Sequence, residues 1–188
     1  MSQLSSHRPG VFIGNDLDRV NRHQSFLRGA RWNCSIPKPF STHWFLTSLR
    51  AAGWTSKRVS TDVYERAFAE EGINLSFKAR EFLRRFGGLI IRYESNSHQK
   101  DALEFFADRA VVGMADEGIK NFEHLIGIAP LCPIGHYLFG TCMLFMDVNG
   151  RVFGGSDTTL TSIGNTGEEA IANILNGSPI EILEPQVA

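Results

Sequence analysis

Residues 137–153 read YLFGTCMLFMDVNGRVF, and they carry the strongest structural signal in the chain. Asn149-Gly150 stands between two apolar segments, and both residues tolerate the positive φ that a tight hairpin turn needs. The pattern predicts two antiparallel strands, over residues 137–146 and 151–153. The first arm shows no alternation of polar and apolar residues, so we expect it to be covered on both faces or to lie at the centre of a sheet.

The other elements predict an α+β fold. Helical spacing of apolar residues indicates helices over about residues 41–52, 60–71, 76–86, 109–126 and 166–176. Further strands are expected over residues 89–93, paired with 103–106, over 159–163 and, as an edge, over 180–183. Pro130–Gly135 reads as a rigid loop before the hairpin, and Thr166 and Glu169 have the spacing of a capping box. We therefore expect a single domain whose antiparallel sheet of about four to six strands packs against surrounding helices.

The charge distribution divides the chain. The net charge of −1 combines about +4 over residues 1–39 with about −5 over the rest. Pro37 and Pro39 mark the boundary, because proline disfavours a continuing helix. We expect a basic, flexible N-terminal extension over residues 1–39 and a folded domain over residues 40–188. An acidic domain would repel phosphates, which argues against nucleic acid as a direct ligand.

The cysteines indicate reduced thiols. Cys34, Cys132 and Cys142 are odd in number and form no CxxC pair, which does not fit a disulfide framework. No apolar run approaches the roughly 20 residues that cross a bilayer, and the first residues lack the apolar core of a signal peptide. We expect a cytoplasmic protein with no membrane partner.

No catalytic motif stands out. The sequence lacks a GxSxG elbow, a Walker loop, an HExxH pair and a GxGxxG turn. A thiol hydrolase built on Cys34 or Cys132 with His43 or His136 stays an alternative. Zinc-type ligands in one region are His124, Cys132, His136 and Cys142. Their spacing matches no structural zinc pattern, so we expect no metal and no cofactor.

Charged residues suggest two surfaces. The helix predicted over residues 76–86 exposes a mixed face of Lys78, Arg80, Glu81, Arg84 and Arg85, which we interpret as solvated. Acidic residues gather around the predicted strand pair and the helix after it. They form either an ordinary solvated surface or a docking face for a basic partner. The candidate partner-binding residues are Glu94, Glu104, Asp108, Asp116 and Glu117.

Five short segments, taken in order, resemble the SUKH superfamily, and most closely its third family of bacterial immunity proteins. They are LRAAGW at 49–54 with Arg58, FLRRFGGL at 82–89, PIG at 133–135, LFMDVNGRVF at 144–153 and GEEAI at 167–171. The similarity covers roughly residues 41–178. Its positions that we expect to shape the scaffold are Gly53, Trp54, Arg58, Gly87, Gly88, Pro133, Gly135, Asp147 and Gly150.

This resemblance implies a non-enzymatic α+β protein that binds and neutralises a toxin of a polymorphic or contact-dependent toxin system. Many toxins paired with the superfamily are nucleases or nucleic-acid deaminases. Such enzymes tend to carry basic grooves, which an acidic inhibitor would fill. Because members of the wider superfamily also act as adaptors, a protein-interaction module without a toxin stays a second hypothesis. The resemblance leaves the partner surface and the oligomeric state open.

Overall fold

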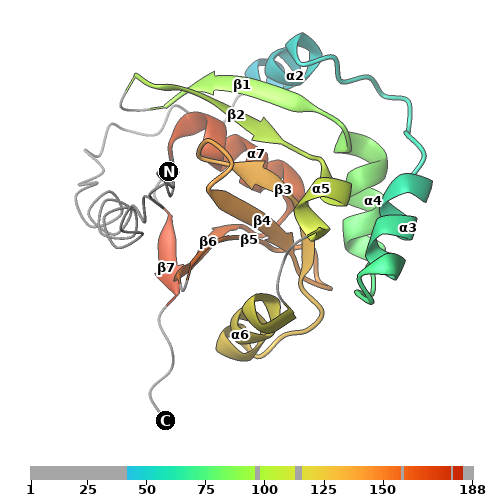
Figure 1. The fold of residues 1–188 in the computed structure, drawn as a ribbon. Coiled ribbons are helices and arrows are strands. Elements are labelled where there is room, and N and C mark those ends of the chain that lie inside the picture. The colour runs from blue at the N-terminus through green and yellow to red at the C-terminus, as the bar shows by residue number, and fades with distance from the viewer. Residues whose placement is uncertain (1–41, 96–97, 113–115, 158, 179, 184–188) are drawn as a thin grey trace, which may run out of the picture. The chain divides into compact units, whose positions relative to one another are not determined.

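The computed structural model describes residues 42–95, 98–112, 116–157, 159–178 and 180–183, so the extension predicted over residues 1–39 lies outside the described part (Figure 1). These residues form one α+β domain. Its sheet has seven strands in the order of the sequence: β1 (Ile90–Glu94), β2 (Lys100–Glu104), β3 (Cys132–Tyr137), β4 (Cys142–Met146), β5 (Val152–Ser156), β6 (Thr159–Gly164) and β7 (Glu181–Leu183). Each strand pairs antiparallel with the next. The predicted fold class is confirmed, with slightly more strands than expected.

Helices cover both faces of this sheet. They are α2 (Thr42–Ala51), α3 (Asp62–Glu70), α4 (Phe77–Phe86), α5 (Ala107–Val111), α6 (Asp116–Ile126) and α7 (Gly167–Asn176). The larger core joins one face to α2, α3, α4, α5 and α7. The smaller core joins the other face to α6 through Ile119 and Phe122 (Figure 1).

Strand β4 lies at the centre of the sheet, as its sequence predicts. Leu144 and Met146 belong to the larger core, whereas Phe145 between them belongs to the smaller one. Successive side chains of a strand point to opposite faces, so apolar residues are needed at every position when both faces are covered. The lack of alternation in the sequence therefore reflects two-sided burial.

The predicted strand over residues 137–146 is wrong in its first half. Tyr137 ends β3 and Cys142 begins β4, with a turn between them in which Leu138, Phe139 and Gly140 all have positive φ. Positive φ is costly for bulky residues, so tertiary contacts must support it. Leu138 packs against the larger core, and the Phe139 N–H donates to Asp101 Oδ1 at 2.9 Å.

The single helix predicted over residues 109–126 is also wrong. The structure has two helices there, because α5 packs into the larger core and α6 into the smaller one on the opposite face. One straight helix cannot reach both faces. Val112 has an extended backbone, with φ −71° and ψ 127°, and ends α5.

Two strand boundaries also differ from the prediction. Strand β2 covers residues 100–104 and not 103–106, and it begins earlier than predicted because its polar Asp101 is buried and accepts from the Tyr93 hydroxyl at 2.8 Å. The segment predicted as a rigid loop over residues 130–135 enters β3 at Cys132. A register shift between Pro133 and Gly135 accommodates the proline in that strand.

Candidate functional site: two basic hollows beside α4

The loop after α2 is fixed against the end of α4 by Trp54. Its indole Nε1–H donates to the Arg85 carbonyl at 3.0 Å, and its ring stacks on Phe86 with centroids 6.5 Å apart. Gly53 turns the chain with φ +88°, a conformation that glycine adopts without strain. The loop over residues 54–58 therefore lies along α4 in one defined position.

Ion pairs connect this loop, α4 and α7. Arg58 Nη1 lies 2.7 Å from Glu81 Oε2, and Arg85 pairs with Glu168 in the first turn of α7. The hydrogen bond from Arg58, together with its charge and that of Arg84, lowers the pKa of Glu81, while desolvation opposes this shift. The face of α4 that we expected to be solvated is accessible to water. Its ion pairs also connect α4 to the loop after α2 and to α7.

The turn between β4 and β5 is locked by Asp147. This carboxylate is fully buried and accepts from the backbone N–H groups of Asn149 and Arg151, each at 2.9 Å. Arg151 Nε adds a third contact at 2.7 Å. Gly150 has φ +92°, and a Cβ there would lie 3.6 Å from the stem of Lys78 on α4. The turn predicted from Asn149-Gly150 is thus confirmed and lies beside α4.

Helix α7 begins directly against α4. Thr166 caps it by accepting from the Glu169 N–H at 3.1 Å, and the Glu169 carboxylate accepts from the Asn165 N–H at 3.0 Å. A Cβ on Gly167 would lie 2.3 Å from the Phe82 ring, so only glycine permits this approach. The first turn of α7 is therefore held next to Arg85.

These four segments enclose two open hollows that share Arg58 and Arg85. The first has a volume of about 300 Å³ and is lined by Arg85 and residues 54–58. The second has a volume of about 390 Å³ and is lined by α4, the β4–β5 turn and the start of α7. Their charged lining residues are Lys57, Arg58, Lys78, Arg85, Glu81 and Glu168. The two hollows together carry four cations against two carboxylates, so their joint surface is positive. We call this joint surface the basic hollows.

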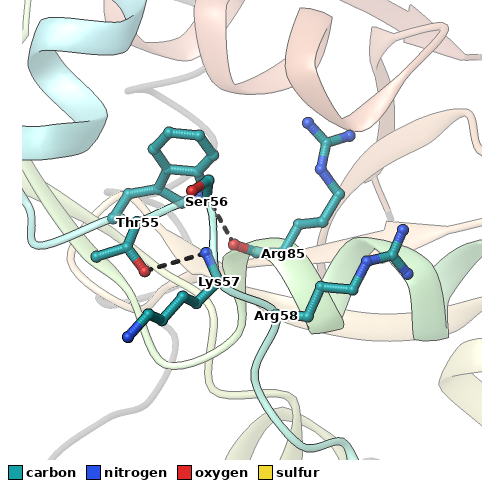
Figure 2. A pocket seen from close by; sticks show the side chains of 6 residues that line it. Thr55, Ser56, Lys57, Arg58 and Arg85 are labelled. Atoms are coloured by element: carbon teal, nitrogen blue, oxygen red, sulfur yellow. Dashed lines mark hydrogen bonds between the residues drawn. The ribbon is translucent and has the colours of Figure 1, made fainter.

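Figure 2 shows how three of these cations are arranged. The side chains of Arg58 and Arg85 extend toward the same side, whereas Lys57 extends away from them. The backbone N–H of Lys57 donates to Thr55 Oγ1 at 3.3 Å, which fixes the loop at this point (Figure 2). The two hollows are adjacent, because Arg58 and Arg85 line both of them. Lys57 lines the first hollow and Lys78 lines the second.

The scaffold positions predicted from the resemblance divide into two groups. Trp54, Arg58 and Gly150 line the basic hollows. Others permit close packing elsewhere: a Cβ on Gly87 would lie 2.5 Å from the Leu83 carbonyl oxygen, and one on Gly135 would lie 2.0 Å from the Glu104 carbonyl oxygen. The basic hollows were missed from the sequence, since their cations come from segments far apart in the chain.

The predicted acidic face is distributed over several elements. In the β1–β2 register Glu94 stands opposite Lys100, and Glu104 opposite Ile90, so the two glutamates lie at opposite ends of the ribbon. Asp108 lies in the first turn of α5, four residues after Glu104. Glu94 and Glu104 therefore contribute to different parts of the surface.

The remaining two predicted residues begin another helix. Asp116 and Glu117 are the first residues of α6, which packs on the face of the sheet opposite to α5. Their contribution to a docking face stays a prediction.

The described thiols are held in their protonated forms. Cys132 is fully buried, accepts from the Ser76 N–H at 3.3 Å and donates to the Asn74 carbonyl at 3.4 Å. Burial raises its pKa, and burial raises the pKa of Cys142 to about 12. A catalytic cysteine needs a depressed pKa, so neither thiol has the environment of a nucleophile.

Within the described part of the chain, the other chemical alternatives receive no geometric support. Burial lowers the pKa of His136, and the nearby Glu104 opposes this shift. Cys34 lies outside the described residues. Among the residues that the structure describes, no group of three or more His, Cys, Asp or Glu side chains is arranged to hold a metal ion.

Comparison with protein families gives a match over most of the chain. The sequence model of the SUKH-3 immunity protein family matches residues 44–177, which extend from α2 to the end of α7. No curated protein and no solved structure matches the chain. Separately, none of the helices in the described ranges has the length and apolarity of a membrane span.

Proposed function

Because the chain belongs to the SUKH-3 immunity protein family, we propose that it binds a cognate bacterial toxin and neutralises it by forming a protein complex. The observation that carries this proposal is the family match over residues 44–177. The buried, protonated Cys132 thiol supports a binding role over a hydrolase built on that residue. In this role the protein needs a rigid surface and no reacting group.

The charge of the folded domain suggests the class of toxin. Residues 40–188 carry a net charge of about −5. Nucleases and nucleic-acid deaminases present basic surfaces to phosphates, and an acidic inhibitor competes for such surfaces. We propose that the partner is a nuclease or deaminase domain of a polymorphic or contact-dependent toxin.

Acidic residues near the end of β2 and on the two following helices are the proposed contacts. Glu104 and Asp108 lie four residues apart, and both are half-buried. Glu117 begins α6. Charge reversal at Glu104, Asp108 and Glu117 should weaken toxin binding while the fold is retained. Unchanged affinity in the triple variant would remove this acidic face from the proposal.

The functional test is protection of cells. The tagged chain is first used to capture its partner from its own cells, and the captured toxin domain is then expressed in a sensitive host. Co-expression of the chain should restore growth, whereas an unrelated acidic protein of similar size should not. Capture of signalling proteins only, with no toxin domain and no protection, would favour the adaptor hypothesis.

A further inference from the structure

We propose that the two basic hollows form one docking surface for an acidic segment of a protein partner. This inference goes beyond the proposed toxin contact, which uses acidic residues on other elements. It concerns the chemistry of the bound segment and holds for a toxin or for any other partner.

The first step is the unbalanced charge. Arg58 and Arg85 are paired with Glu81 and Glu168, yet about half of each arginine side chain is exposed, 54% and 45% respectively. None of the ion pairs among the residues that the structure describes includes Lys57 or Lys78, and both lysines are exposed. The surface therefore keeps positive charge for an external carboxylate.

The second step is the rigidity of the surface. Trp54 is fixed by its hydrogen bond to Arg85 and its stacking on Phe86. Asp147 fixes the β4–β5 turn through three contacts, and Gly167 holds α7 against α4. Association costs less free energy when the binding groups are already ordered, so this surface is prepared for a partner.

The third step selects the class of partner. Glu81 and Glu168 line the surface and would repel phosphates and carboxylates alike, so the choice between nucleic acid and a protein segment rests on the uncharged lining. Phe82, Met146 and Asn149 add apolar walls and an amide to the second hollow. This mixture suits a protein segment, whose carboxylates meet the cations while its other side chains and peptide groups meet the remaining lining.

The fourth step is the arrangement of the cations. Lys57 borders the first hollow, Arg58 and Arg85 border both, and Lys78 borders the second. An extended segment placed across both hollows would meet positive charge along its length. Its carboxylates would be most sensitive to Lys57 and Lys78, because these lysines have no internal partner among the described carboxylates.

The test uses the full chain, labelled with ¹⁵N, and a capped hexaglutamate peptide as the probe. The chain has three tryptophans, and a Trp54→Phe variant identifies the Trp54 indole signal. Because Trp54 lines the first hollow, the peptide should shift this signal saturably. The dissociation constant should rise with salt, as expected for charge pairing at an exposed surface. An unmoved Trp54 signal would overturn the proposal.

Two double variants localise the binding. Lys57→Glu with Lys78→Glu should weaken peptide affinity by about tenfold or more, since like charges are then opposed. Arg66→Glu with Arg92→Glu makes the same change in net charge at exposed positions outside both hollows and should leave affinity unchanged. Equal weakening in both variants would contradict a specific surface.

Two further measurements complete the design. If the charge-reversed hollow variant does not fold, Lys57→Gln with Lys78→Gln replaces it, with a smaller loss of affinity expected. An oligothymidylate of ten nucleotides serves as the nucleic-acid probe. Stronger binding of this oligonucleotide than of hexaglutamate at the Trp54 signal would overturn the choice of a protein segment.

Discussion

Asp147 contributes more to the stability of the β4–β5 turn than its place in a hairpin loop suggests. It is fully buried, and its two oxygens satisfy two backbone amides and the guanidinium of Arg151. Asp147→Ala leaves these donors without their acceptor, so we expect the free energy of unfolding to fall by about 3 kcal/mol. Urea unfolding followed by tryptophan fluorescence measures this change.

Asp147→Asn is the matched control. The amide keeps one oxygen for the backbone N–H groups of Asn149 and Arg151 but loses the charge that faces the guanidinium. We expect a smaller loss of about 2 kcal/mol, because the 39% exposed Arg151 side chain turns to water while the buried amide nitrogen is left without an acceptor. Equal losses for the alanine and asparagine variants would show that the charge, and not the amide contacts, holds the turn.

Cys142 makes the free energy of unfolding depend on pH in the alkaline range. Burial raises the pKa of this thiol from 9.0 to about 12, so the folded state keeps a proton that the unfolded chain releases above pH 9. The folded state then binds more protons, and the free energy of unfolding decreases as pH rises through this window. Each such proton contributes a slope of at most about 1.4 kcal/mol per pH unit.

The slope is measured by urea unfolding between pH 9 and pH 10, where the thiols of the unfolded chain and, toward pH 10, its tyrosines release protons. Cys142→Ala should flatten the slope, whatever its effect on stability at neutral pH. Cys132 and the tyrosines Tyr64, Tyr93 and Tyr137, whose pKa values burial also raises, leave a residual slope in this variant. A slope that is identical in the wild type and the variant would contradict the assignment to Cys142.

The contact between strands β2 and β3 depends on a single glycine. A Cβ on Gly135 would lie 2.0 Å from the Glu104 carbonyl oxygen, which belongs to the backbone and cannot move aside like a side chain. We expect Gly135→Ala to lower the free energy of unfolding by about 3 kcal/mol. Thermal and urea unfolding measure the loss.

Gly127→Ala separates this clash from the general effect of losing a glycine. Gly127 has φ +65° with no heavy atom within 4 Å of an added Cβ, so its alanine variant meets only backbone strain of about 1 kcal/mol. Similar losses at positions 135 and 127 would argue that the close approach of β2 and β3 is not what Gly135 permits.

Sequence patterns predicted the elements whose signals are local. The helix start at Ser76 and the cap at Thr166 were readable, because a capping side chain contacts an amide three residues away. The turn of residues 138–141 was not, since positive φ at Leu138 and Phe139 depends partly on Asp101, a residue distant in the sequence. The boundary between α5 and α6 likewise depends on which face of the sheet each helix covers.

The candidate site could not be predicted from local patterns either, because its residues come from distant parts of the domain. The sequence identified Trp54, Arg58 and Gly150 as separate scaffold positions, yet their meeting around Arg85 requires the fold. The acidic residues were grouped by proximity in the sequence, whereas the antiparallel register separates Glu94 from Glu104. Long-range pairing determines which charges share a surface, and no short-range pattern encodes it.

The two proposals place partner contacts of opposite charge on the folded domain. The basic hollows are rigid, and their two lysines take part in none of the described ion pairs. The acidic residues proposed as toxin contacts lie on β2, α5 and α6. An inhibitor that acts by binding needs no turnover, so its effect on a toxin should follow the amount of complex formed. This separates it from an enzyme, whose effect would continue to grow with time.

The most direct measurement is a titration of the purified toxin domain with the full chain, followed by the toxin's own enzymatic activity. Activity should fall in proportion to the chain added and vanish at a fixed molar ratio, with no further change over time. A heat-unfolded sample of the chain is the control and should have no effect. Full toxin activity in the presence of an excess of about tenfold would contradict neutralisation by binding.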